Sequence, residues 1–329
     1  MAYILAADIG GTKTNIGIFD SEQGCRNSIV EETLLCKNYS NFNELLHDFL
    51  NEKEYPIERA CFAAAGPVRE GRVRLTNLPW TLDENELKDF LGILSVYVIN
   101  DLVALAYSIP ELTEKDTVTL HEGTPEKLGT IGIVAPGTGL GMSFLVWDGL
   151  KYIACPSESG HACFSPASEE ELELLRFLLP QKKHVSFEYL CSGMGMPHIY
   201  KYLKEKVGLE EPDWLNIQVT EAKDPTPVIV QVALNKEIEC NICLETVRFF
   251  IKILAVASGN LAVTAMTTGG IYLGGGMLPG LLSFLQEDVF RMRFVEKGEM
   301  SRLLENIPIS VITNPKAGLI GAATFTTYI

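Results

Sequence analysis

Apolar runs and polar breaks divide the first part of the chain into short strands and helices. Apolar residues at 3–7 and 16–19 flank the turn Asp8-Ile9-Gly10-Gly11-Thr12, which predicts two strands joined as a β-hairpin. Shorter apolar runs predict further strands over 57–65, 73–75 and 96–99. Helical spacing of apolar residues predicts helices over 43–50, 83–91 and 102–108.

The same pattern starts again after residue 129. Apolar runs over 130–135 and 142–146 flank Gly137-Thr138-Gly139-Leu140-Gly141, so a second strand–turn–strand unit is predicted. The remaining expectations are helices over 168–179, 195–207, 236–265, 281–290 and 317–326, strands over 270–273 and 309–312, and a polar surface excursion over 213–227. Strands that alternate with helices in both halves indicate α/β architecture.

The two glycine turns suggest a site for the phosphates of a nucleotide. Glycine permits positive φ and lets a ligand approach the backbone, and successive exposed N–H groups in such a turn can hold an anion. Asp8, at the end of the first strand, is placed to act through a metal ion, although a plain turn aspartate would have the same position. Three common motifs are absent: the chain has no Gly-Lys dipeptide for a Walker A loop, Met142 replaces the last glycine of a Rossmann fingerprint, and no HRD or DFG motif occurs.

Composition narrows the partners and the compartment. The 329 residues carry a formal net charge of -15, which argues against nucleic acid or an anionic membrane as a partner but leaves MgATP open. No basic region precedes the first apolar run, so no secretory signal is expected. The eight scattered cysteines, Cys240 and Cys243 among them, are expected to be reduced thiols in the cytoplasm. The apolar segment 253–266 is too short to span a bilayer, so a buried helix is expected there.

A series of motifs occurs in a fixed order along the whole chain. These motifs are Asp8-x-Gly10-Gly11-Thr12, Thr76-Asn77 with Trp80, Asn100-Asp101, Gly137-Thr138-Gly139-Leu140-Gly141, Glu158-Ser159-Gly160-His161, Glu188 with Leu190-x-Ser192-Gly193, Gly274-Gly275-Gly276, and Asn314-Pro315-x-x-Gly318. Together they resemble the bacterial glucokinases, a family of the actin-like ATPase superfamily. The resemblance implies an α/β fold of two RNase H-like domains with a cleft between them. It places a small domain at residues 1–105 and about 313–329, and a large domain at residues 106–312.

The resemblance also implies ATP-dependent phosphorylation of glucose at its 6-hydroxyl. Asp101 would be the general base that accepts the proton of that hydroxyl. From the residues alone, a helix N-cap is an equally good interpretation of Asp101, because an apolar helix follows it. Asp8 would hold Mg²⁺ through a water molecule. The glycine turns would hold the nucleotide: Gly10, Gly11 and Thr12 at one end of the triphosphate, Gly137, Thr138 and Gly139 at the other, and Gly274, Gly275 and Gly276 against the adenine or ribose.

Four polar residues would bind the sugar in this interpretation: Asn100, Glu158, His161 and Glu188, with Asn77 as a further contact. Carboxylates form charge-assisted hydrogen bonds with hydroxyl groups, and an asparagine amide can both donate and accept. A structural histidine paired with Glu158 is the alternative for His161.

Two features separate the chain from the related ROK group of sugar kinases and repressors. Those proteins carry a cysteine-rich zinc loop after the Glu-x-Gly-His segment, whereas here only Cys163 precedes Cys191, so no zinc is expected. The basic DNA-binding extension of the repressors is also missing. The family resemblance suggests a homodimer. Two alternatives stay open: a kinase for another hexose, such as an N-acetylhexosamine or mannose, and a non-catalytic sugar sensor on the same fold.

Overall fold

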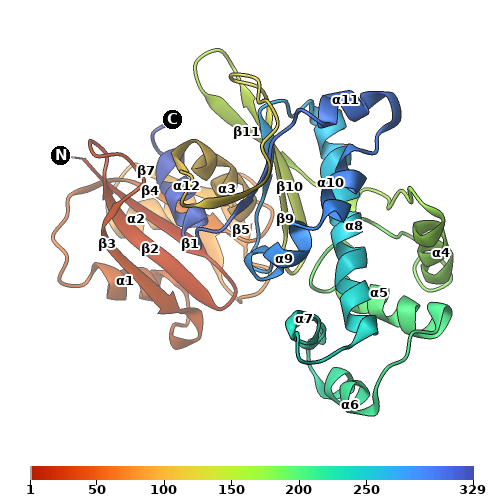
Figure 1. Cartoon of the computed structure of the whole chain (residues 1–329). Coiled ribbons are helices and arrows are strands. Elements are labelled where there is room, and N and C mark those ends of the chain that lie inside the picture. Colours follow the sequence, from red (N-terminus) through yellow and green to blue (C-terminus); the bar gives the residue numbers. More distant parts are fainter. Residues whose placement is uncertain (1) are drawn as a thin grey trace. The chain divides into compact units, whose positions relative to one another are not determined.

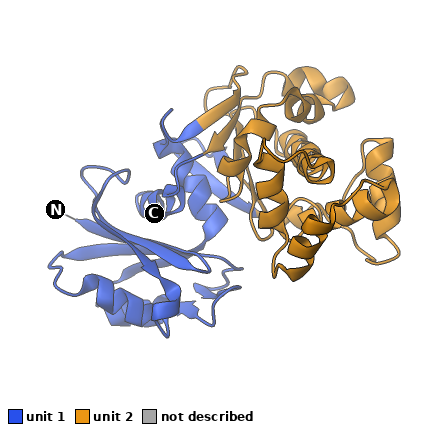
Figure 2. Cartoon of the chain, turned by 60° about the horizontal axis from the view of Figure 1, so that its bottom comes forward, with its two compact units in different colours: residues 1–117, 145–156, 313–329 blue, residues 118–144, 157–312 orange. Residues whose placement is uncertain are grey.

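The computed structural model describes residues 2–329 and has the predicted α/β architecture (Figure 1). The chain forms two compact units, which Figure 2 shows in different colours. Unit 1 comprises Met1–Thr117, Leu145–Pro156 and Thr313–Ile329, and unit 2 comprises Val118–Phe144 and Ser157–Ile312. The chain therefore passes between the units several times, and its C-terminal segment returns to unit 1. The predicted domain boundaries and the predicted cleft stay predictions.

Unit 1 is built on a five-stranded sheet with the strand order β3-β2-β1-β4-β7. Its strands are β1 (Tyr3–Ile9), β2 (Lys13–Asp20), β3 (Ser28–Leu35), β4 (Ile57–Ala64) and β7 (Ser95–Asn100), and a small ribbon pairs β5 (Arg72–Arg74) with β6 (Thr81–Asp83). The predicted hairpin is confirmed, because β1 and β2 pair antiparallel, and β2 pairs antiparallel with β3. β4 lies parallel to both β1 and β7.

Helices cover both faces of this sheet. Alternate residues of β1 point to opposite faces, as a strand requires. Leu5, Ala7 and Ile9 belong to the core beneath α1 (Phe42–Leu50) and α2 (Glu84–Leu91). Ile4 and Ala6 belong to the core beneath α3 (Asp101–Ser108) and α12 (Ala317–Phe325). A strand buried on both faces explains why 3–7 is a continuous apolar run.

Unit 2 contains most of a six-stranded sheet with the order β11-β10-β9-β12-β13-β8. Its strands are β8 (Thr117–His121), β9 (Ile131–Pro136), β10 (Leu140–Trp147), β11 (Tyr152–Ser157), β12 (Gly270–Leu273) and β13 (Ile309–Ile312). The strands β11-β10-β9-β12-β13 follow the same order as β3-β2-β1-β4-β7 of unit 1. In both sheets, numbered along the chain, the third, second, first, fourth and fifth of these strands lie side by side. The predicted repeat of one supersecondary unit is therefore confirmed, and β12 is parallel to both β9 and β13.

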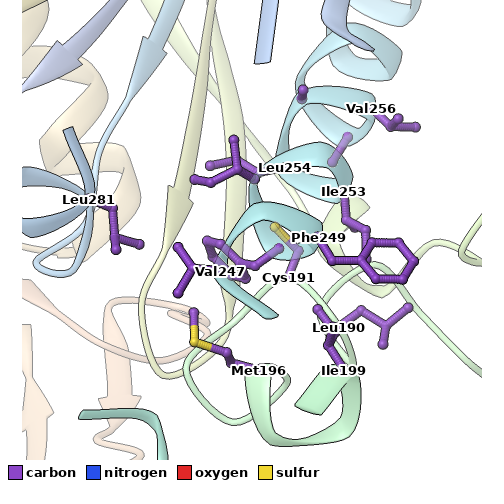
Figure 3. Close-up of a cluster of buried hydrophobic side chains, with 14 of the residues drawn as sticks. Leu190, Cys191, Met196, Ile199, Val247, Phe249, Ile253, Leu254, Val256 and Leu281 are labelled. Carbon is purple, nitrogen blue, oxygen red and sulfur yellow. The ribbon is translucent and has the colours of Figure 1, made fainter. Parts of the chain in front are cut away.

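The helices of unit 2 surround α8 (Asn241–Ala265). The others are α4 (Glu169–Leu178), α5 (Met196–Tyr202), α6 (Asp213–Glu221), α7 (Thr226–Leu234), α9 (Leu282–Leu285), α10 (Asp288–Val295) and α11 (Ser301–Leu304). Figure 3 shows Phe249, Ile253 and Leu254 of α8 beside Ile199 of α5 and beside Leu190, which precedes α5. α8 includes the apolar segment 253–266 up to Ala265, which confirms a buried helix there.

Three predictions for unit 2 are wrong or inexact. The expected excursion over 213–227 is instead α6 and the start of α7, because Pro227, which looked like a break, occupies the first turn of α7, where proline fits. The helix expected over 236–265 begins at Asn241. The helix expected over 281–290 is two helices, α9 and α10, since Glu287 is extended between them and accepts a hydrogen bond from Arg248.

Four strands were not predicted: β3, β6, β8 and β11. All four are partly exposed, β3 carries Glu31 and Glu32, and β6 has only three residues, so their sequences lack the apolar runs of the buried strands. Pairing with a neighbouring strand, rather than local sequence, fixes them. All eight cysteines are free thiols, as expected. Among residues 2–329, none of the helices combines the length and apolar character needed to cross a bilayer.

Candidate functional site

The first glycine turn lies at the tip of the β1–β2 hairpin in unit 1. The Gly10 N–H donates to the Lys13 carbonyl at 3.0 Å, which leaves Gly11 and Thr12 at the tip. Neither glycine has a left-handed φ, so the expectation that this turn uses positive φ is wrong. Close approach explains Gly11 instead, because a Cβ there would lie 2.8 Å from the Asn77 Cβ. Asn77, a predicted sugar contact, therefore packs against this turn.

Asp8 lies near the end of β1, beside the start of α12. A Cβ on Gly318, the second residue of α12, would lie 2.5 Å from Asp8 Oδ2, so only glycine lets the helix come this close. Burial and, secondarily, the negative charge of Asp101 raise the pKa of Asp8 to about 6, while the positive charge of Lys13 opposes them. Lys13 is not among the predicted site residues, yet its positive charge lowers the pKa of Asp8, the proposed metal-binding carboxylate.

Asn100 and Asp101 stand at the same sheet edge as Asp8. In the parallel pairing of β1, β4 and β7, Ile9 lies opposite Ala64, and Ala64 lies opposite Asn100. The C-terminal ends of these strands therefore meet at one edge, where open α/β sheets usually bind their ligands. The influence of Asp101 on the pKa of Asp8 agrees with this arrangement.

The N-cap of α3 is Asn100. Its Oδ1 accepts a hydrogen bond from the Leu102 N–H at 2.9 Å, and its Nδ2 donates to the Gly66 carbonyl at 3.1 Å. The Asp101 Oδ1 also accepts from the Leu102 N–H at 2.9 Å. Although Asp101 is exposed, desolvation by the surrounding protein raises its pKa, and the hydrogen bond from Leu102 works against that rise. From sequence, Asp101 could have been the N-cap of α3 instead of a catalytic residue. In the structure the N-cap is its neighbour Asn100.

The second glycine turn joins β9 to β10 in unit 2. The Gly137 N–H donates to the Gly139 carbonyl at 2.8 Å, and Thr138 is exposed at the tip. The Leu140 N–H donates to Glu188 Oε2 at 2.9 Å. A Cβ on Gly139 would lie 2.4 Å from the same oxygen, so glycine is needed there for Glu188 to approach. The predicted sugar residue Glu188 therefore also holds the predicted phosphate turn.

The glycine triplet 274–276 runs beside this second turn. The Gly274 N–H donates to the Val134 carbonyl at 2.9 Å. Gly275 has φ +99°, and a Cβ on it would lie 2.2 Å from the Pro136 carbonyl oxygen. Gly276 is exposed, and a Cβ there would meet nothing within 4 Å. The fold therefore requires glycine at position 275. At position 276 no protein contact requires glycine.

Glu158, His161 and Glu188 come together in unit 2. The His161 Nδ1 lies 3.6 Å from Glu188 Oε1, and its Nε2 lies 3.9 Å from Glu158 Oε2. Both distances exceed a direct hydrogen bond, and the side chains of His161 and Glu158 are 60% and 84% exposed. The Glu188 N–H donates to the Gly160 carbonyl at 2.8 Å, which fixes the two segments side by side. This group offers a ring nitrogen and carboxylate oxygens, the groups that recognise sugar hydroxyls.

Sequence reasoning missed two residues that support the second turn. The Gly193 N–H donates to the Gly137 carbonyl at 2.8 Å, and the Thr226 hydroxyl donates to the Gly193 carbonyl. Gly193 belongs to the motif Leu190-x-Ser192-Gly193, to which the sequence assigns no role in the site. Thr226 lay in the segment expected to be a surface excursion, so nothing in its local sequence pointed to the site.

The carboxylates of unit 1 fit a magnesium ion bound together with phosphates. Mg²⁺ in kinases usually takes one or two protein carboxylates, keeps several waters and relies on the substrate phosphates for the rest. Asp8 and Asp101 are close enough for the charge of one to raise the pKa of the other, so a cation beside Asp8 would relieve their repulsion. A magnesium site of this kind does not need three protein ligands. Among the described residues, no group of three or more His, Cys, Asp or Glu side chains is arranged to hold a metal ion.

Known proteins match this chain over nearly its whole length. The glucokinase family model matches residues 5–328. The glucokinase of Nostoc punctiforme is 38% identical over an alignment of 337 positions. The alignment covers 98% of this chain and 98% of that protein. The chain belongs to the glucokinase family. The predicted family and enzyme class are confirmed.

Solved structures of glucokinases share the fold. A glucokinase from an Antarctic psychrotroph is 31% identical, with a TM-score of 0.87 over 99% of both chains. A ROK family glucokinase from Streptomyces griseus, solved in complex with glucose and AMPPNP, is 18% identical, with a TM-score of 0.63 over 98% of both chains. The second likeness concerns the fold alone, which the glucokinase and ROK groups therefore share.

Proposed function

We propose that this member of the glucokinase family transfers the γ-phosphoryl group of MgATP to the 6-hydroxyl of glucose, with Asp101 as general base. One observation carries the assignment of the base. Asn100 supplies the cap of α3, and the neighbouring carboxylate of Asp101 has a raised pKa at the ligand-binding edge of the sheet. A raised pKa makes a carboxylate a stronger base.

The timing of proton transfer suits a carboxylate. Phosphoryl transfer passes through a loose transition state, so the attacking hydroxyl becomes acidic late in the reaction. Asp101 therefore need only accept a proton that is already leaving. Its main task is to hold the hydroxyl oxygen in line with the phosphorus atom, and its place at the start of a capped helix supports that task.

The glycine turns are proposed to hold the phosphoryl donor. The N–H groups around Gly10, Gly11 and Thr12 would contact one end of the triphosphate, and those around Gly137, Thr138 and Gly139 the other. Bound Mg²⁺ would neutralise the charge that develops on the phosphoryl oxygens. Asp8 would hold that ion through water, and the triplet Gly274 to Gly276 would leave room for adenine or ribose beside its backbone.

The sugar is proposed to contact Asn100, Asn77, Glu158, His161 and Glu188. The Oδ1 of Asn100 accepts one hydrogen bond, from the Leu102 N–H, which leaves one of its lone pairs for a hydroxyl group. The open distances from His161 to both carboxylates leave acceptor capacity on Glu158 and Glu188. None of these groups distinguishes one hexose from another by charge, so the choice of glucose rests on the family.

A sugar panel tests the proposed function. The purified protein is supplied with MgATP and, in turn, glucose, mannose, fructose and N-acetylglucosamine, and ADP release is measured in a coupled assay. We expect glucose to give the highest kcat/KM and glucose 6-phosphate to be the product by NMR. A higher kcat/KM for mannose or an N-acetylhexosamine would reassign the substrate. Sugar binding without turnover of any sugar would make the protein a sensor.

The family resemblance is also the basis for proposing a homodimer that works in the cytoplasm. Sedimentation equilibrium across a range of protein concentrations tests the dimer, and the mass of a single chain at every concentration would reject it. Localisation of the protein in cell fractions tests the compartment.

A further inference from the structure

One segment of unit 2, residues 188–193, holds both ends of the second glycine turn. At one end, Glu188 Oε2 accepts from the Leu140 N–H at 2.9 Å. At the other, the Gly193 N–H donates to the Gly137 carbonyl at 2.8 Å. The Ser192 hydroxyl donates to the Glu188 carbonyl at 2.7 Å and so closes the segment on itself. The turn that is proposed to bind phosphates therefore depends on how firmly this segment is fixed.

The hydrophobic core anchors the segment on both sides of Gly193 but not at Gly193 itself. Leu190, Cys191 and Met196 are fully buried beside α8 (Figure 3). Gly193 has no side chain to pack, and a Cβ there would lie 3.1 Å from the Gly137 carbonyl oxygen. Glycine also has the freest backbone of any residue. The N–H that binds Gly137 lies in the peptide group before the Gly193 Cα, and the Gly193 carbonyl lies in the peptide group after it. Without a further contact on that carbonyl, rotation of the backbone at Gly193 could turn the N–H away from Gly137.

Thr226 supplies that further contact. Its hydroxyl donates to the Gly193 carbonyl, and only 6% of the residue is exposed. Thr226 is the first residue of α7, its own N–H donates to Asp224 Oδ1 at 3.0 Å, and Ile229 of the same helix is fully buried. The hydroxyl thus connects a helix anchored in the core to the one flexible point of the segment.

We propose that Thr226 is a positioning residue for the phosphoryl donor: its hydroxyl holds the Gly193 carbonyl, limits rotation of the backbone at Gly193, and so fixes the N–H that binds the Gly137 to Gly139 turn. The inference rests on the proposed role of that turn. Thr226 acts on the donor and not on the sugar, because its contact leads to Gly137, at the opposite end of the turn from Glu188. The residue touches no substrate in this proposal, and it works only through the backbone of Gly193.

Two substitutions separate the hydroxyl from the packing of Thr226. Thr226→Val keeps the shape and removes the donor, whereas Thr226→Ser keeps the donor and removes a methyl group. The affinity for AMPPNP with Mg²⁺ is measured by calorimetry, together with KM for ATP and KM for glucose. We expect Thr226→Val to raise KM for ATP and weaken AMPPNP binding by about fivefold, the effect of one buried hydrogen bond. We expect KM for glucose to stay within about twofold of the wild-type value in the same assay.

Thr246→Val is the matched control. Thr246 is a fully buried threonine of unit 2 whose hydroxyl donates to the Ile242 carbonyl at 2.7 Å within α8. Thr246→Val removes a buried threonine hydrogen bond that lies away from the glycine turn. The variant should therefore have a lower midpoint of thermal unfolding and an unchanged KM for ATP. If Thr226→Val does not fold, Thr226→Ala is compared with Thr226→Ser, because only serine retains the donor.

The outcomes are distinct. Equal rises in KM for ATP and KM for glucose in Thr226→Val, or a rise in Thr226→Ser as large as that in Thr226→Val, would overturn the proposal. An unchanged KM for ATP in Thr226→Val would do the same. Absence of ATP-dependent turnover in the wild-type protein would instead reject the proposed function, while the AMPPNP affinities would still test the role of Thr226.

Discussion

Asn100 and Asp101 contribute differently to the start of α3. A side chain that caps a helix must point its oxygen at the first N–H groups of that helix, and Asn100 does so. Its amide carries no charge, so it can stay in this position without influencing Asp8. Asp101 then contributes the negative charge at the sheet edge, where it raises the pKa of Asp8.

This division predicts the behaviour of Asp101→Asn. The substituted amide oxygen can still accept from the Leu102 N–H, so α3 and the sugar site should be preserved. Without a general base, kcat should fall by about 10²- to 10⁴-fold. Steady-state kinetics measures kcat, and calorimetry measures glucose binding, which should stay within about twofold of the wild-type value. Full activity would remove Asp101 from the role of base. Asp89→Asn, an exposed change on α2, is the control.

Glu188 is expected to matter more for glucose than for ATP. In Glu188→Gln the amide oxygen can still accept from the Leu140 N–H, so the glycine turn keeps its contact. The charge that faces His161 is lost, and KM for glucose should rise by about tenfold, the strength of one charge-assisted hydrogen bond. KM for ATP should change less. Kinetics with each substrate varied in turn decides this, and an unchanged KM for glucose would place Glu188 outside the sugar site. Glu173→Gln, on the exposed face of α4, is the control.

Asp8 should make unit 1 less stable as the pH rises. Its pKa is about 6 in the folded chain against 3.8 for the unperturbed group, so the folded state holds this proton more tightly than the unfolded state. Below about pH 4, Asp8 is protonated in both states and does not change the free energy of unfolding. As the pH rises from about 4 to about 6, the free energy of unfolding falls by roughly 2–3 kcal/mol in all.

Asp8→Asn removes the charge that causes this loss. The variant should be more stable than the wild type above about pH 7 and nearly equal to it near pH 4, while most of its kinase activity is lost. Urea unfolding at a series of pH values without Mg²⁺ measures the difference. A difference that does not vary with pH would show that Asp8 is not a buried, titrating carboxylate.

At the level of the elements, the glycine turns contain glycines of two kinds. Gly275 is required by the fold, since it has a left-handed φ and a Cβ there would collide with the Pro136 carbonyl, and Gly139 is required for Glu188 to keep its contact with the turn. At Gly137 and Gly276 a Cβ would meet nothing within 4 Å, and neither has a left-handed φ. The fold alone would accept alanine at these two positions, so the proposed nucleotide is the remaining reason for glycine.

Gly137→Ala and Gly276→Ala are therefore expected to separate stability from function. Each variant should unfold no more easily than the wild type, because alanine reduces the entropy of the unfolded chain by an amount worth about 0.4–1 kcal/mol. KM for ATP should rise in both while KM for glucose stays unchanged. Gly280→Ala is the matched control: it is equally open and lies in the same region of unit 2, but outside the glycine triplet. A normal KM for ATP in both variants would argue that no nucleotide approaches these residues.

At the level of the whole molecule, Asp116 joins three distant parts of the chain in unit 1. Its carboxylate accepts from the Thr113 N–H at 2.7 Å, from Arg26 at 2.7 Å and from Asn314 Nδ2 at 2.8 Å. Its backbone carbonyl accepts from the Thr313 N–H at 2.8 Å. Desolvation alone would raise the pKa of Asp116, but these hydrogen bonds outweigh it and lower the pKa to about 2. The network fixes the segment that leads into α12, the helix beside Asp8.

Asp116→Asn should destabilise unit 1 at neutral pH by about 2–3 kcal/mol. The sign follows from the lowered pKa: the contribution of Asp116 is complete above about pH 4 and disappears as the pH falls towards 2, so the variant and the wild type should converge there. Urea unfolding gives both values. The surface pair of Glu31 and Lys316 provides the control, and Glu31→Gln should cost less than about 1 kcal/mol. Equal effects of the two substitutions would contradict a special role for Asp116.

The sequence by itself determined the features that depend on neighbouring residues. Apolar runs specified the buried strands β1, β4, β7, β9 and β12, and the glycine motifs identified both turns and the family. These patterns are local, because a strand or a turn is fixed by residues a few positions apart. The edge strands were missed for the same reason: β3 depends on its pairing with β2 and has no buried run of its own.

Only the tertiary structure decided which residues meet across long stretches of chain. Glu188 reaches the glycine turn from 48 positions away, and Thr226 reaches Gly193 from 33. It also decided that Gly11 is needed for close approach to Asn77 rather than for positive φ. Such contacts follow from the path of the chain around α8 and the two sheets, and no local pattern encodes that path. The motifs therefore identified the parts of the site, and packing between distant segments determined how those parts support one another.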